Sequence, residues 1–162
     1  LSPKENREIP PLRYEVVYQL KQDFPELNIA LNGGVTTAEQ IRHHWNHVDG
    51  VMIGREAWHN PWSLTQWDGL MAGEPDRAVT LTRDEVELAM VAYMEREAAQ
   101  YDTWWYAVAR SMLGLRHGQR GARRWRQVWS DHRLKGAKPL EVYDLAQKAL
   151  HSSPPVLEED VH

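Results

Sequence analysis

Two glycine-containing turns hold the residues of this sequence that are best suited to bind an anion. The first follows a short apolar run and contains Asn32, Gly33 and Gly34, and the second follows another apolar run and contains Gly54 and Arg55. Glycine at the end of a strand lets a ligand approach the backbone, whose N–H groups can then donate to a phosphate. The guanidinium of Arg55 can add a charge-assisted hydrogen bond. One such turn is common, but two at this spacing predict a single phosphate cradle.

The segments around the turns predict how they are brought together. We expect a helix over residues 14–23, a strand up to the first turn, a helix from residue 38 to about residue 46, and a strand before the second turn. Thr37 and Gln40 form a capping box for the second helix. Strands joined through a helix pair in parallel, so both turns should lie at one edge of the sheet. The continuous apolar runs predict that both faces of the sheet are covered. Gly54 and Arg55 then begin another helix, whose dipole favours an anion.

The sequence after Pro61 predicts a change from an α/β to an all-α organisation. Residues 68–80 are rich in turn-forming residues, so we place a domain boundary there. Four helices should follow: one that Thr82 and Glu85 cap, one over residues 103–115, one over residues 122–132, and one from Pro139. The predicted domains are residues 1–70 and 71–150, followed by a disordered tail at 151–162.

The composition excludes several classes of chemistry. The 162 residues are 42% hydrophobic and 26% charged and contain no cysteine, which excludes disulfides, zinc–thiolate sites and a cysteine nucleophile within this chain. No run of about 18 apolar residues indicates a membrane span, so a cytoplasmic protein without a membrane partner is expected. Because the chain opens at Leu1 on a loop-like segment, we expect it to be the C-terminal part of a longer protein.

A basic block interrupts an otherwise acidic chain of net charge −4. Residues 1–109 hold 9 Lys and Arg against 17 Asp and Glu, whereas residues 110–138 hold 9 against Asp131 alone. This asymmetry favours a polyanion as partner, and the alternative is a solvated basic helix face. On the helix over residues 122–132, one face carries Trp125, Val128, Trp129 and His132, and the opposite face carries Arg123, Arg124 and Gln127.

Other candidate groups favour structural roles. Trp104, Trp105 and Tyr106 are spaced like core residues, which is more typical of packing than of base stacking. His43 and His47 share a helical face at a metal-ligand spacing, but no third ligand lies near them in the sequence, so no metal site is predicted. Nothing assigns a catalytic role to the residues around the second turn.

The segments SPKENREIPPL, LNGG, DGVMIGREAWHNPW and MLGLRHGQRGARRWRQ resemble the C-terminal half of the tRNA-dihydrouridine synthase A family, over roughly residues 1–150. The resemblance implies an FMN-binding (β/α)₈ TIM barrel, of which this chain holds the last two strands, followed by a helical tRNA-binding domain. It implies an oxidoreductase that uses NADPH to reduce the C5–C6 bond of D-loop uridines in tRNA. It also implies a monomer that binds tRNA and not DNA.

The resemblance assigns roles to two sets of residues. The set expected to bind the FMN phosphate is Asn32, Gly33, Gly34, Gly54 and Arg55. The set expected to contact tRNA is Lys4, Arg7, Arg120, Arg123 and Arg124. The family's general acid is a cysteine, and this chain has none, so no catalytic residue is predicted here and the chain alone should be inactive.

Two alternatives fit part of the pattern. Another FMN-dependent barrel oxidoreductase, similar to the dihydroorotate dehydrogenases, would explain the glycine turns but not the basic helix. A non-enzymatic RNA-binding module would explain the basic helix and the missing cysteine. Binding of unmodified tRNA across a salt series distinguishes these two alternatives.

Overall fold

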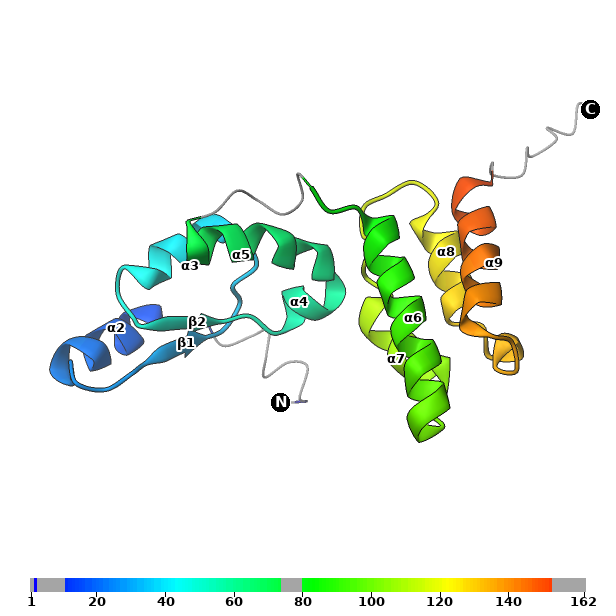
Figure 1. The fold of residues 1–162 in the computed structure, drawn as a ribbon. Helices are drawn as coiled ribbons and strands as arrows, with labels where there is room; N and C mark the ends of the chain where they lie inside the picture. Colours follow the sequence, from blue (N-terminus) through cyan, green and yellow to red (C-terminus); the bar gives the residue numbers. More distant parts are fainter. Residues whose placement is uncertain (1, 3–10, 74–79, 153–162) are drawn as a thin grey trace, which may run out of the picture.

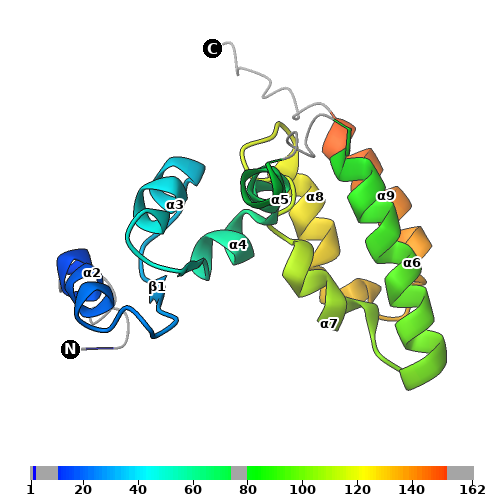
Figure 2. The ribbon, with the colours of Figure 1, turned by 60° about the vertical axis from the view of Figure 1, so that its left-hand side comes forward.

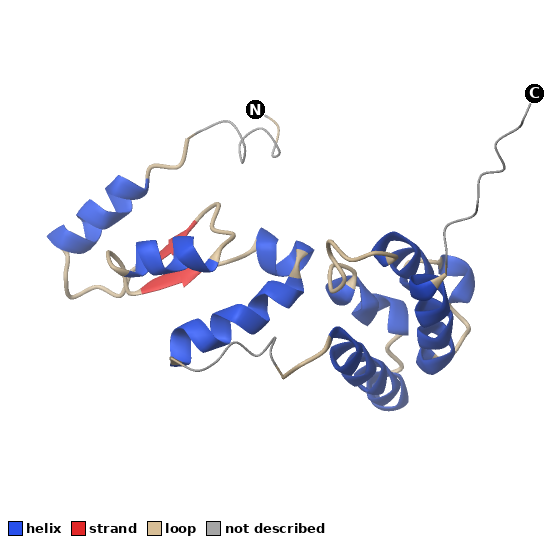
Figure 3. Cartoon of the chain, turned by 90° about the horizontal axis from the view of Figure 1, so that it is seen from above, coloured by secondary structure: helices blue, strands red, loops and turns tan. Residues whose placement is uncertain are grey.

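The computed structural model describes residues 2, 11–73 and 80–152, and of residues 68, 71 and 72 it describes the backbone alone. The described residues form two groups of elements, which Figure 1 shows side by side. The first group consists of α2 (Tyr14–Asp23), β1 (Ala30–Asn32), α3 (Ala38–Trp45), β2 (Gly50–Met52), α4 (Arg55–His59), the 3-10 turn η1 (Pro61–Ser63) and α5 (Leu64–Ala72). The second group is helical and consists of α6 (Arg83–Tyr101), α7 (Trp105–Ala109), η3 (Arg110–Met112), α8 (Ala122–Trp129), η4 (His132–Leu134) and α9 (Pro139–His151). The chain is therefore mostly helical, with a small parallel sheet near its beginning (Figure 3).

The two strands pair in parallel, as expected, in the register Ala30 to Gly50, Leu31 to Val51 and Asn32 to Met52. Only one face of this sheet is covered within the described residues. Leu31 is 1% exposed and packs in a cluster with Val35, Ile41, Val48 and Trp67, whereas Met52 on the other face is 49% exposed. The expectation that both faces are covered is therefore wrong for the described chain, because its helices pack on the Leu31 side.

The helix boundaries near capping residues match the sequence. The helix over residues 14–23 is α2, and Thr37 with Gln40 forms the capping box at the start of α3. Thr82 and Glu85 form a second capping box at the start of α6. Pro139 begins α9, where a missing N–H costs nothing. These signals are local, so sequence reasoning located them.

Three helix assignments need correction. The segment expected to be turn-rich from residue 68 begins inside α5, which runs from Leu64 to Ala72, because Trp67 packs in the sheet cluster and Gly73 ends the helix at φ 67°. The helix expected over 103–115 stops at Ala109 and continues as η3 and tight turns, which bring Gly114 against the backbone of His59. The helix expected to reach His132 ends at Trp129, because the Asp131 carboxylate caps η4 by accepting from the Arg133 N–H.

A second hydrophobic cluster forms the core of the helical group. Its buried members come from α6 to α9: Val91, Met94, Trp105, Ala109, Met112, Leu115, Trp125, Trp129, Val142, Ala146 and Leu150. Two separate clusters agree with two domains, but the connection over residues 74–79 and the tail after residue 152 lie outside the described residues. The domain boundaries therefore stay a prediction.

Candidate functional site

The first glycine turn lies directly after β1 and is shaped by the chain itself. Gly33 and Gly34 have φ angles of 146° and 65°, which side-chain-bearing residues rarely adopt. The hydroxyl of Tyr14 donates to the Gly33 carbonyl at 2.8 Å. A Cβ on Gly34 would lie 2.8 Å from Cδ1 of Leu12. Glycine is thus required here by backbone geometry and packing before any ligand is considered.

Gly54, in the second turn, has no such structural requirement. Its φ and ψ of −104° and −79° are open to ordinary residues, and an added Cβ would meet only the tip of Met52, 3.6 Å from Cε. No side chain among the described residues caps the start of α4 at this position. The backbone at Gly54 is therefore approachable, as a bound anion would need.

The parallel pairing brings the two turns to one edge of the sheet. Asn32 ends β1 opposite Met52, so Gly33 and Gly34 on one strand and Gly54 on the other leave the sheet at the same end. Arg55 is exposed and makes no ion pair with any described residue. The structure thus places all five residues predicted for the phosphate cradle at or next to one edge of the sheet.

The acidic residue next to this edge is turned away from it. Glu56, in the first turn of α4, accepts a hydrogen bond from the Asn60 side-chain amide at 2.9 Å. The carboxylate therefore lies toward the far end of the short helix. The backbone here is approachable, the Arg55 guanidinium has no ion-pair partner among the described residues, and the Glu56 carboxylate is turned away. These features fit a phosphate group, which is the anionic end of FMN.

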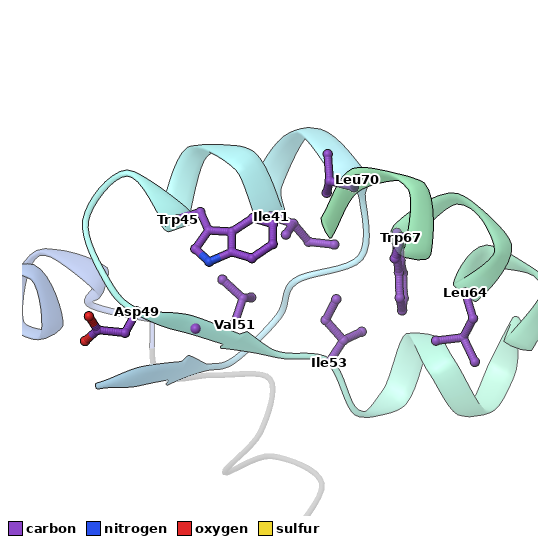
Figure 4. Close-up of a pocket in the computed structure, with 9 residues that line it drawn as sticks. Ile41, Trp45, Asp49, Val51, Ile53, Leu64, Trp67 and Leu70 are labelled. Carbon is purple, nitrogen blue, oxygen red and sulfur yellow. The ribbon is translucent and has the colours of Figure 1, made fainter. Parts of the chain in front are cut away.

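A mostly apolar cavity lies on the covered side of the sheet (Figure 4). Its volume is about 360 Å³, and its lining residues are Ile41, Trp45, Asp49, Gly50, Val51, Ile53, Leu64, Trp67 and Leu70. Its one carboxylate, Asp49, accepts from the Ile29 N–H at 2.8 Å and pairs with Lys21 at 2.8 Å. These two hydrogen bonds lower the pKa of Asp49. With no cation in its lining, this cavity does not fit an anion.

The basic block divides into internal and exposed side chains. Arg116 is 4% exposed and pairs with Glu87 at 2.6 Å and with Asp84. Burial disfavours its charge, but the hydrogen bonds that its guanidinium donates to the Asp84 and Glu87 carboxylates outweigh this effect and raise the pKa of Arg116. Arg133 holds the Asp131 carboxylate by hydrogen bonds that lower the pKa of Asp131 to about 2. Arg133 is itself exposed. The other exposed members of the block are Arg110, Arg120, Arg123, Arg126, Lys135 and Lys138.

The predicted tRNA-contacting residues differ in their surroundings. Arg120 and Arg123 are exposed, as expected. Arg124 was expected on the outer face beside Arg123, but it is half-buried and donates to the carbonyls of Ala149 at 2.9 Å and Ser152 at 2.6 Å. Its guanidinium thus satisfies the carbonyl groups at the end of α9. Lys4 and Arg7 lie outside the described residues.

Sequence reasoning missed the buried carboxylate of Glu87, which is 0% exposed. Its Oε1 accepts from the indole N–H groups of Trp125 and Trp129 at 2.7 and 2.8 Å. Its Oε2 accepts from Arg116 and from the Gln147 amide, the latter at 3.0 Å. The helical period of α6 could have indicated that Glu87 is buried, because Glu87 shares a helical face with the buried residues Val91 and Met94.

The aromatic and histidine residues are only partly where the sequence placed them. Trp125 and Trp129 are buried, which confirms the inner face of α8, whereas His132 falls after the helix and is exposed. Trp105 is a core residue, but Trp104 is 54% exposed. No group of three His, Cys, Asp or Glu side chains able to hold a metal occurs among the described residues. The His43 and His47 rings pack edge-on, with centroids 5.6 Å apart.

A family comparison identifies the class of protein that this fold and site belong to. The model of the dihydrouridine synthase (Dus) family matches residues 2–152, so the chain belongs to the dihydrouridine synthase family. The resemblance drawn from the sequence motifs is thereby confirmed.

Individual relatives refine this placement within the family. The chain is 49% identical over 150 residues to a tRNA-dihydrouridine(20/20a) synthase of Pseudomonas aeruginosa, covering 93% of this chain and 44% of that protein. It is 46% identical over 152 residues to the protein of that name from Shewanella oneidensis, with coverage of 94% and 44%. For the Escherichia coli K12 protein of that name the identity is 45% over 148 residues, with coverage of 91% and 42%. The chain spans less than half the length of these relatives. No described helix is long and apolar enough to cross a membrane.

Proposed function

We propose that this chain forms part of an FMN-dependent tRNA-dihydrouridine synthase, in which it holds the phosphate end of the cofactor and a surface for tRNA. The observation that carries the proposal is Gly54, which the chain's own packing does not require to be glycine and which lies at the same sheet edge as the Gly33–Gly34 turn. Flavin in this position would supply hydride for reduction of the C5–C6 bond of uracil, with NADPH as the source of electrons.

The architecture supports the proposal of a TIM barrel. In such a barrel, the strands have helices on their outer face and side chains filling the interior, and phosphate sites form after strands seven and eight. The sheet here has helices on the Leu31 side, while Ala30, Asn32 and Met52 on the other side are exposed. This exposed side is the one that would face the interior of a closed barrel. The two turns would then be the loops after its last two strands.

The chain's residues would bind and orient but not transfer protons. Backbone N–H groups at Gly34 and Gly54 would donate to the phosphate, and Arg55 would add positive charge beside them. The exposed arginines of α8 and the turn before it, Arg120 and Arg123, would contact phosphates of tRNA. A different FMN oxidoreductase would share the cradle but would have no use for these exposed cations.

Flavin content tests the cradle. Gly54→Asp would place a carboxylate where the phosphate is proposed to bind, so we expect at least a tenfold loss of bound flavin from the purified full-length protein, measured by visible absorbance. Gly136→Asp is the matched control, because a Cβ there meets nothing within 4 Å and the charge change is the same. Flavin retained by the Gly54 variant at the level of the Gly136 variant would refute the site.

A further inference from the structure

The end of α4 packs tightly against the helical group, so the junction between the two groups has a fixed geometry. A Cβ on Gly114 would lie 2.1 Å from the carbonyl oxygen of His59 and 2.9 Å from Cδ of Pro61. Beside this contact, the guanidinium of Arg83 lies 4.2 Å from the centroid of the Trp62 ring and donates to the Leu115 carbonyl at 2.9 Å. Figure 2 shows α4 running toward the helical group at this junction.

A cavity of about 220 Å³ opens at this junction. Its lining residues, which define the junction pocket, are Trp58, His59, Arg110, Leu113, Gly114 and Arg126. Arg110 and Arg126 are exposed, and neither forms an ion pair with a described residue. No carboxylate lines the pocket. Its lining therefore attracts an anion.

The aromatic member of the junction pocket adds a second kind of recognition. Trp58 is 56% exposed, and its ring makes no aromatic or cation–π pair among the described residues. An exposed indole is a platform for a nucleobase, and arginines bind phosphates. An indole and two arginines in one pocket thus match the two chemical parts of a nucleotide.

Size and surroundings favour a nucleotide that belongs to a polymer. The pocket is smaller than the roughly 300–1,000 Å³ of sites that enclose a whole small-molecule ligand. Arg123 and Arg126 lie three residues apart on α8 and are both exposed, so positive charge continues from the pocket along the helix. A polyanion could follow this line of charge after leaving the pocket.

We propose that the junction pocket binds one unpaired nucleotide of an RNA, with its base stacked on Trp58 and its neighbouring phosphates held by Arg110 and Arg126. This inference rests on the proposed function, because it takes RNA as the substrate. It adds a binding site and gives roles to three residues, Trp58, Arg110 and Arg126, to which the sequence motifs assigned none.

Equilibrium binding of an unmodified tRNA transcript to the purified protein across a salt series tests the pocket. Trp58→Ala should weaken binding about 5- to 100-fold with little change in salt dependence, because it removes stacking and not charge. Arg126→Ala should lower the slope of log K against log salt by about 0.7 to 0.9, the contribution of one phosphate contact. Trp58→Phe should retain most of the affinity, because it keeps an aromatic face.

Two matched controls lie outside the pocket. Trp104→Ala removes a tryptophan of similar exposure, 54%, and Arg96→Ala removes an exposed arginine on α6. If the Trp58 and Arg126 variants bind tRNA as these controls do, while the protein still reduces uridine in tRNA, the pocket is refuted and the proposed function stands. If the unaltered protein binds no tRNA, both fail. If Trp58→Ala raises the KM for NADPH and leaves tRNA binding unchanged, the pocket takes the reductant's nucleotide, and the RNA assignment is overturned.

Discussion

Replacing Glu87 by glutamine tests the buried hydrogen-bond network that connects α6, α8 and α9. The carboxylate accepts from two indoles on one oxygen and from Arg116 and Gln147 on the other. Glutamine keeps the shape of the side chain but offers one acceptor oxygen in place of two. Whichever way its amide is oriented, its N–H₂ group faces donors that already point at it.

The expected cost follows from what is left unpaired. The Arg116 side chain is 5% exposed, and without Glu87 its remaining ion-pair partner among the described residues is Asp84, whose side chain is 58% exposed. Removing one member of a buried ion pair typically costs about 3–5 kcal/mol. The hydrogen bonds to a charged acceptor that are lost contribute about 1.5–3 kcal/mol each and are part of the same cost. We therefore expect Glu87→Gln to lower the free energy of unfolding by about 3–5 kcal/mol.

Urea unfolding followed by tryptophan fluorescence is a direct assay, because Trp125 and Trp129 contact the carboxylate itself. At a denaturant slope of about 2 kcal/mol/M, the midpoint should fall by about 1.5–2.5 M. Glu95→Gln, an exposed position on the same helix, should change the free energy by no more than about 0.5 kcal/mol. A loss below about 1 kcal/mol for Glu87→Gln would show that the network does not hold the helices together as argued.

Two further predictions concern backbone packing and pH. Gly121→Ala should destabilise the protein by more than about 1–3 kcal/mol, because φ is 81° and the new Cβ would lie 2.1 Å from the Leu150 carbonyl oxygen. Gly136→Ala is the control: its Cβ meets nothing within 4 Å, so it should be nearly neutral in the same urea assay. The pKa of His44 lies below its usual value of 6.5, chiefly because the side chain is buried and also because His43 and His47 are near it. The unfolded chain therefore binds a proton at His44 more readily than the folded chain does. Stability should be greatest above pH 6.5 and fall as the pH drops through that value, and this dependence should shrink in His44→Gln but persist in His43→Gln.

Local signals explain which parts of the fold could be predicted from the sequence. The starts of α3 and α6 depend on capping residues three positions apart, and the parallel pairing follows from two apolar runs joined through a helix. By contrast, α5 depends on Trp67 packing in the sheet cluster, and the break after Ala109 places Gly114 against His59. Contacts between segments distant in sequence decide these features, so no short window contains them.

The candidate sites divide in the same way. The edge shared by the two glycine turns was predictable, because parallel strands place their ends together. The roles of individual arginines were not predictable from charge alone. Arg116 meets Glu87 across 29 positions, and Arg124 meets Ala149 across 25, so helix packing decides which guanidinium is internal and which is exposed. A count of basic residues predicts a polyanion partner but overstates the number of side chains that are free to contact it.

The short helix α4 connects the proposed phosphate cradle to the junction pocket. Gly54 precedes it and His59 ends it, so five residues, about 7.5 Å of helix, separate the two proposed sites. Gly114 packs directly on the His59 carbonyl, so the pocket cannot move away from α4 unless the junction opens. A nucleotide in the pocket would thus lie beside the phosphate end of the proposed cofactor site. Because the pocket is proposed to bind RNA and holds no residue assigned to the reduction itself, Trp58→Ala should raise the KM for tRNA far more than it lowers kcat.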